Sequence, residues 1–178
     1  LLLDFMKKKA EKEGNRAALL ALTNHELEQI KGTVFRQTMF AEFERKAHAL
    51  AQEGQALTKE LLCELYKTLN EEYFGEAIAL DDFIPYEWMR IPHFYRAFYV
   101  YQYATGYSAA VAFSRSILGG EPGAAEKYLG FLAAGGSKDP LDVLFDAGLD
   151  MRSPAAVERC MLAFEEALGR LEALLKEG

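Results

Sequence analysis

The sequence has 178 residues, 51% of them hydrophobic and 26% charged, so it is long enough to bury one sizeable core. Its net charge of -7 and its pI near 5.1 argue against nucleic acid or an anionic membrane as a main partner, because either would require a concentrated basic face. Two isolated cysteines give no disulfide framework, and no apolar run could span a bilayer. We expect a single helical domain of residues 1–178 in the reducing cytoplasm.

The first five residues are mostly apolar and have no helix cap ahead of them. Two interpretations carry similar weight. The segment is the frayed start of a helix, or it packs against a neighbour supplied by the rest of a longer protein. In the second case residues 1–5 would form exposed apolar surface through which the chain could dimerise.

The next two segments have apolar residues at helical spacing. Thr23 or Asn24 is predicted to cap a helix that runs from His25 to about Gln52. A second predicted helix follows the cap residue Thr58 and continues to residues 74–75, where a glycine ends it.

The second half of the sequence is also predicted to be helical. Residues 98–103 alternate aromatic side chains as a strand would, but no partner strand exists elsewhere in the sequence. We therefore predict a helix that places Tyr99, Tyr103, Gly106 and Tyr107 on one face. Short helices joined by turns are expected over residues 121–150, and Ser153–Pro154 is typical of a helix start. The predicted fold class is all-α, an irregular multi-helix bundle.

Two possible catalytic patterns are weak. Residues 25–29 begin like the zinc motif HExxH, but Gln29 stands where the second histidine would be, and an amide is a poor zinc ligand. Cys63 and Cys160 lie among apolar helix positions without a basic neighbour that would lower a thiol pKa. We predict no metal ligand within this chain.

The segment 93–106 is the strongest candidate for a site, because it places one imidazole and four phenols close together. Tyrosines at helical spacing are more often packing residues than catalysts. So many hydroxyl groups are nevertheless hard to satisfy inside a core, which favours a cleft where they could hydrogen-bond a carbonyl or an oxyanion.

Several segments together resemble the C-terminal part of oligoendopeptidase F, a family of zinc metallopeptidases related to thimet oligopeptidase. The similar segments are GTVFRQTMFAEFE (32–44), IPHFY (91–95), FYVYQYATG (98–106), FLAAGGS (131–137) and AGLDM (147–151). The resemblance covers nearly the whole chain. It implies half of a metallopeptidase catalytic domain, in which the HExxH motif and a glutamate ligand would precede Leu1.

This resemblance implies a zinc-dependent endopeptidase that hydrolyses oligopeptides, with zinc held by the upstream N-terminal part of the enzyme and not by this chain. His93, Tyr99 and Tyr103 are the expected catalytic residues, which would donate hydrogen bonds to the scissile carbonyl. Tyr101 and Tyr107 are expected substrate contacts. The isolated chain is expected to be inactive. The alternative is a catalytically inactive helical module that binds peptides or proteins.

Overall fold

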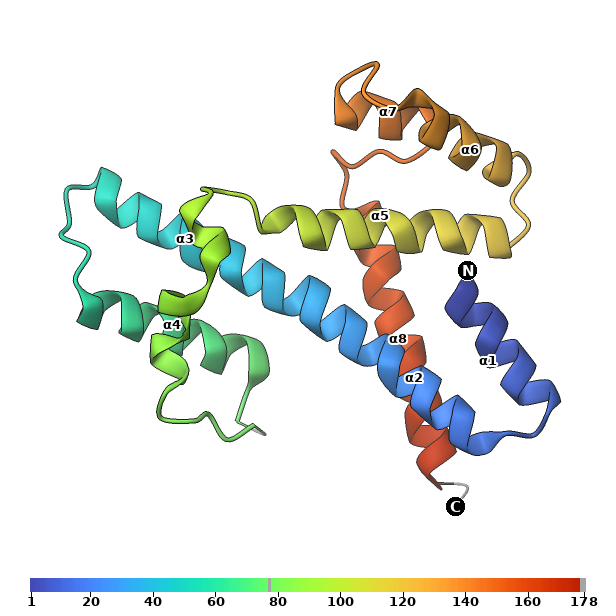
Figure 1. The fold of residues 1–178 in the computed structure, drawn as a ribbon, viewed down its shortest axis with the longest axis horizontal. Helices are drawn as coiled ribbons and strands as arrows, with labels where there is room; N and C mark the ends of the chain where they lie inside the picture. Colours follow the sequence, from blue (N-terminus) through green and yellow to red (C-terminus); the bar gives the residue numbers. More distant parts are fainter. Residues whose placement is uncertain (77, 177–178) are drawn as a thin grey trace. The chain divides into compact units, whose positions relative to one another are not determined.

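The computed structural model describes residues 1–76 and 78–176 (Figure 1). Within these residues the regular secondary structure consists of helices and contains no strand, which confirms the predicted all-α fold class. None of the helices in this described part is both long and apolar enough to cross a membrane. The elements, in chain order, are α1 Leu2–Lys12, α2 Arg16–Ile30, the π-helix η1 Lys31–Phe35, α3 Arg36–Gln52, α4 Lys59–Phe74, the 3₁₀ helices η2 Ile84–Arg90 and η3 Pro92–Tyr95, α5 Tyr101–Leu118, α6 Ala124–Ala134, α7 Pro140–Asp146 and α8 Ala155–Lys176.

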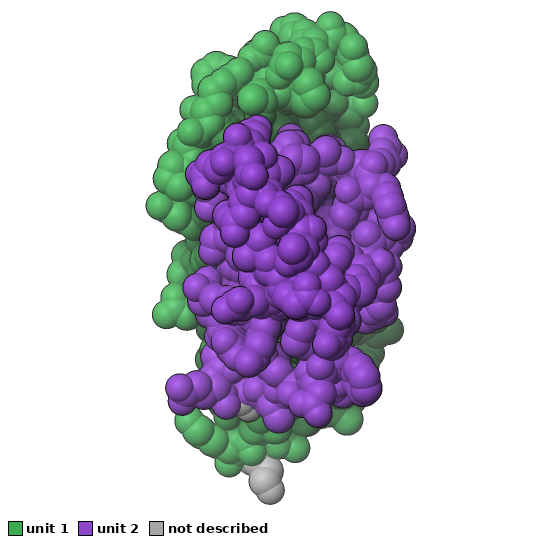
Figure 2. Space-filling model, turned by 90° about the vertical axis from the view of Figure 1, so that its left-hand side faces the viewer, with its two compact units in different colours: residues 1–31, 105–178 green, residues 32–104 purple. Residues whose placement is uncertain are grey.

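The helices group into two compact units, which Figure 2 colours separately. Unit 1 consists of Leu1–Lys31 and Thr105–Gly178, and unit 2 of Gly32–Ala104. The expectation of one domain over residues 1–178 stays a prediction.

In unit 1, α2 packs against both α1 and α8, and α6 packs against α7 (Figure 1). Small side chains allow the helices and loops to approach closely around one aromatic ring, because alanine adds little bulk at a helix contact. That core cluster consists of Ala109, Ala112, Phe113, Ala147, Leu149 and Ala156. The apolar side chains of Leu2 and Phe5 on α1 are 71% and 64% exposed.

The start of α2 corrects one prediction. The helix begins at Arg16 and not at His25, because the Asn15 side chain accepts a hydrogen bond from the Ala18 N–H at 3.0 Å and so caps the first turn. Thr23, one of the two predicted caps, lies fully buried inside the helix. The predicted end at Gln52 is confirmed, although the π-helix η1 interrupts the α-helical geometry on the way.

In unit 2, α4 packs against α3 and η2 (Figure 1). Both predicted ends of α4 are confirmed. Thr58 accepts a hydrogen bond from the Leu61 N–H at 3.3 Å, and Gly75 ends the helix at a φ of 66°, which favours glycine. The core cluster between these elements consists of Met39, Phe40, Phe43, Tyr66, Leu69 and Val100.

The C-terminal predictions hold with small shifts. Two short helices, α6 and α7, occupy the region predicted to contain them. The last helix, α8, begins at Ala155, directly after the predicted Ser153–Pro154 start. The Ser153 hydroxyl donates to the Asp150 carbonyl at 3.0 Å and so belongs to the preceding turn.

Candidate active-site wall

The chain between η2 and α5 places the aromatic candidates of unit 2. Pro92 begins η3 with a backbone φ that suits the first turn of a helix, and His93 follows it. Phe98 then adopts a left-handed φ of 58°, which is uncommon for a bulky residue. Val100 is fully buried and anchors the segment in the core just before α5 begins at Tyr101.

This backbone corrects the prediction that residues 98–103 are helical throughout. Tyr99 precedes the first residue of α5, but its carbonyl accepts the Gln102 N–H at 3.3 Å and its ring contacts that of Tyr103, four residues later, with centroids 5.5 Å apart. The left-handed turn at Phe98 is not compatible with a continuous α-helix, because an α-helix needs negative φ at every residue. The turn therefore lies between His93 and Tyr99, whereas Tyr99 and Tyr103 keep a spacing of four residues at the start of α5.

The structure brings His93, Tyr99 and Tyr103 into one cluster. The Tyr103 hydroxyl lies 3.3 Å from His93 Nε2, and which of the two donates depends on the histidine tautomer. The same hydroxyl donates to the Tyr99 hydroxyl at 3.5 Å, a long hydrogen bond. The His93 and Tyr99 rings stack with centroids 5.7 Å apart, and the Tyr103 ring stands edge-on to both.

The polar ends of this cluster are accessible. His93 is exposed, Tyr103 is 36% exposed and Tyr99 is half-buried, so the hydroxyl groups do not lie deep among aliphatic side chains. The Arg96 guanidinium lies over the Tyr99 ring at 5.3 Å from its centroid. The hydrogen bond with Tyr99 raises the pKa of the Tyr103 hydroxyl above its ordinary value of 10.0, and a phenol is in any case a neutral donor at pH 7.

The two expected substrate contacts lie elsewhere. Tyr101 is in the first turn of α5 and is 49% exposed. Tyr107 belongs to unit 1, where it is partly buried; burial, and to a lesser degree Cys160 and Glu26, raise the pKa of its hydroxyl. Their roles as substrate contacts stay predictions.

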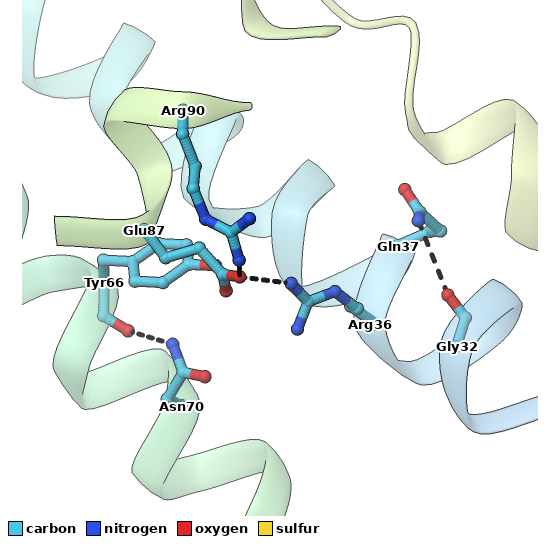
Figure 3. Close-up of polar contacts among 7 residues, drawn as sticks. All are labelled: Gly32, Arg36, Gln37, Tyr66, Asn70, Glu87 and Arg90. Atoms are coloured by element: carbon cyan, nitrogen blue, oxygen red, sulfur yellow. Dashed lines mark hydrogen bonds and ion pairs between the residues drawn. The ribbon is translucent and has the colours of Figure 1, made fainter. Parts of the chain in front are cut away.

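Unit 2 has two buried carboxylates that the sequence analysis did not single out, and one of them holds this segment in place. Glu44 on α3 accepts the Phe98 N–H at 2.8 Å and so stabilises the left-handed turn. Glu87 on η2 accepts from the Tyr66 hydroxyl at 2.7 Å and from Arg36 and Arg90 at 2.6 and 2.5 Å. Figure 3 shows the side chains of this second group converging on Glu87.

The charge of Glu87 is well compensated. Burial alone would raise the pKa of its carboxyl group, but the hydrogen bonds from Tyr66, Arg36 and Arg90 outweigh burial and lower it. A sequence signal existed only for Glu44, which lies four residues after Phe40 on the apolar face of α3. A carboxylate at such a position is a candidate for a buried, partnered group.

A zinc ion does not fit the residues of this chain by themselves. Among the described residues, no group of three or more histidine, cysteine and carboxylate side chains could hold a metal ion. The side-chain partners found for His93 are phenols, which are not the usual zinc ligands.

Residues 2–162 match the family described as peptidase family M3. The chain belongs to peptidase family M3. It is 51% identical to oligopeptidase PepF of Bacillus subtilis over 175 residues, and 47% identical to group B oligopeptidase PepB of Streptococcus agalactiae over 178 residues. The resemblance to oligoendopeptidase F that the sequence indicated is confirmed.

Solved structures agree with this assignment. The crystal structure of oligoendopeptidase-F from Enterococcus faecium superposes on this chain with a TM-score of 0.87 at 47% identity. The superposed region includes 89% of this M3 chain but only 30% of the Enterococcus protein. A putative peptidase from Chlamydophila abortus gives a TM-score of 0.87 at 41% identity. The curated relatives are likewise much longer: this M3 chain matches 26% of the Bacillus and 29% of the Streptococcus protein.

Proposed function

We propose that this chain supplies one wall of the active site of a zinc-dependent endopeptidase that hydrolyses oligopeptides. The observation that carries the proposal is the accessible cluster of His93, Tyr99 and Tyr103, in which three ring systems contact one another within one unit. Its hydroxyl and imidazole groups can donate hydrogen bonds to the same small volume.

In this proposal the cluster binds the scissile carbonyl of the peptide. Attack on that carbonyl places negative charge on its oxygen, and a hydrogen bond from a neutral phenol strengthens as the charge develops. Tyr103 suits this role because a phenol is a neutral donor at pH 7 and because His93 and Tyr99 both contact its hydroxyl. Tyr101 and Tyr107 would contact other parts of the substrate.

The zinc ligands and the general base would lie in the part of the enzyme that this sequence does not contain. The match to only 26–30% of the relatives' lengths supports this division, as does the lack of a metal-binding group among the described residues. The main partner of this chain would then be the upstream part of the same enzyme, against which the exposed Leu2 and Phe5 could pack. The isolated chain would not hydrolyse peptides, and the cytoplasmic location stays a prediction from composition.

The test is Tyr103→Phe in the complete enzyme. The variant keeps the ring and removes one hydrogen-bond donor, so kcat should fall by a factor on the order of 10² or more, while KM changes far less. Tyr86→Phe is the matched control, since Tyr86 is an exposed tyrosine of the same unit outside the cluster. An unchanged kcat for Tyr103→Phe would refute the proposed role.

A second measurement separates this proposal from an inactive binding module. The upstream part of the enzyme, made separately, should restore zinc-dependent peptide cleavage when it is mixed with this chain. Cleavage should be lost again when Tyr103→Phe replaces the wild-type chain in the mixture. Peptide binding without cleavage under all these conditions would favour the module.

A further inference from the structure

Two side chains of α3 hold the backbone between His93 and Tyr99. The Glu44 carboxylate accepts the Phe98 N–H at 2.8 Å, and the His48 ring, one helical turn further along α3, lies against the Phe98 ring with centroids 4.7 Å apart. One face of α3 therefore contacts both the backbone and the side chain of the same residue. All of these residues belong to unit 2.

Both partners of the hydrogen bond between Glu44 and Phe98 are locally unfavourable. Phe98 has a φ of 58°, and a residue with a Cβ atom is disfavoured in that left-handed region. Glu44 is only 4% exposed, and among the described residues its Oε2 has no hydrogen-bond partner. A buried carboxylate with an unpaired oxygen is itself destabilising. Such features persist only where the surrounding structure fixes them, and they cluster at functional sites.

The left-handed turn lies directly beside the proposed active-site wall. Phe98 precedes Tyr99, and the fully buried Val100 anchors the chain on the other side of Tyr99. The Tyr99 ring stacks on His93, and its hydroxyl accepts a hydrogen bond from Tyr103. A rotation of φ at Phe98 toward ordinary negative values would change the angle between the segment that holds His93 and the segment that holds the two tyrosines. The turn therefore sets where the three rings meet.

We propose that Glu44 is a positioning residue: by holding the left-handed turn at Phe98, it fixes the geometry of the proposed catalytic cluster. This inference rests on the proposed function, because Glu44 acts only through the cluster and not on the substrate. What matters is that Glu44 accepts one hydrogen bond, since its other oxygen makes none among the described residues. Its negative charge is not required.

Two substitutions of Glu44 in the complete enzyme test this role. Glu44→Gln keeps an oxygen that can accept the Phe98 N–H, so kcat should stay within about twofold of wild type. Glu44→Ala leaves that buried N–H without an acceptor, so the turn should relax and kcat should fall by about 10-fold to 10²-fold, with a much smaller change in KM. A wild-type kcat in Glu44→Ala would overturn the proposal, and so would an equal loss of kcat in both variants.

A double substitution tests whether Glu44 acts through the backbone of Phe98. Glycine adopts a left-handed φ without the steric penalty of a Cβ atom, so the turn in Phe98→Gly should depend less on Glu44. The loss of kcat caused by Glu44→Ala should therefore be at least about threefold smaller in the Phe98→Gly background than in wild type. An equal loss in both backgrounds would overturn the proposal, because Glu44 would then act elsewhere.

Glu42→Ala is the matched control. Glu42 is also a carboxylate of α3, but its partners are Tyr73 and Lys46 and not the turn. This variant should destabilise unit 2 and leave kcat unchanged at a temperature at which the enzyme is folded. Hydrogen–deuterium exchange of the Phe98 amide reports on the turn without peptidase activity. It should be at least about tenfold faster in Glu44→Ala than in wild type, Glu44→Gln or the control, and equal rates in all four would overturn the proposal.

The outcome for Tyr103→Phe separates this inference from the proposed function. If Tyr103→Phe lowers kcat and Glu44→Ala does not, the positioning role alone is wrong. If Tyr103→Phe leaves kcat unchanged, the proposed function fails and the positioning role fails with it. Should Glu44→Ala not fold, Glu44→Met provides the same test, because methionine fills the space of glutamate without a strong acceptor.

Discussion

Replacement of Glu87 by glutamine should destabilise unit 2 measurably. Glu87 is 7% exposed and accepts three hydrogen bonds, from Tyr66, Arg36 and Arg90. Glutamine keeps the size of the side chain and one carbonyl oxygen, but it carries no charge and turns an NH₂ group toward donors. The three donors would then compete for one acceptor (Figure 3).

The magnitude follows from the burial of each donor. Tyr66 is fully buried, and a hydrogen bond to a charged group contributes about 1.5–3 kcal/mol, of which glutamine would lose roughly half. The Arg36 side chain is 34% exposed, so solvent screening limits its loss to about 1 kcal/mol. The Arg90 side chain is 76% exposed and should contribute close to nothing. We expect a loss of about 1–2.5 kcal/mol for Glu87→Gln.

Glu87→Ala should cost more, about 3–5 kcal/mol, because the Tyr66 hydroxyl would be left buried without a partner. The assay is urea unfolding at neutral pH, followed by far-UV circular dichroism and by the fluorescence of Trp88, which lies on η2 beside Glu87. Glu71→Gln is the control: Glu71 is an exposed carboxylate 3.5 Å from Lys67 and should change the free energy of unfolding by less than about 0.5 kcal/mol. A Glu87→Gln change as small as that of the control would refute the reasoning.

Two further predictions concern pH. The pKa of Glu87 is lowered below its ordinary value of 4.5, so the stabilisation that its charge provides is present above that pH and is lost as the pH falls through the folded pKa. Urea unfolding at stepwise lower pH should therefore show that the difference in free energy of unfolding between wild type and Glu87→Gln shrinks in acid. A difference that stays constant with pH would contradict this prediction. Burial and a hydrogen bond to Glu42 raise the pKa of Tyr73 to about 12 from its ordinary 10.0. Wild type should therefore lose stability relative to Tyr73→Phe as the pH rises from 10 toward 12. If the free energies of unfolding of the two proteins fall in parallel over this pH range, the hydrogen bond does not stabilise the protonated tyrosine.

The sequence alone determined the elements whose signals are local. Thr58 and Gly75 mark the two ends of α4 because a cap and a left-handed glycine act within one turn of the helix. The similarity to oligoendopeptidase F could also be read from contiguous segments. His93, Tyr99 and Tyr103 were found because they lie within eleven residues of one another in the sequence.

Only the tertiary structure decided how these residues meet. A left-handed turn at Phe98 lies between His93 and Tyr99, and that turn is stabilised by Glu44, 54 residues earlier in the sequence. Glu87 is likewise paired with Arg36 across 51 residues. Helical periodicity reports which face of an element is apolar, but it holds no information on which distant donor will reach a buried carboxylate. Such pairings depend on how the helices pack, because packing brings a distant donor within hydrogen-bonding distance of a carboxylate and removes water from that carboxylate.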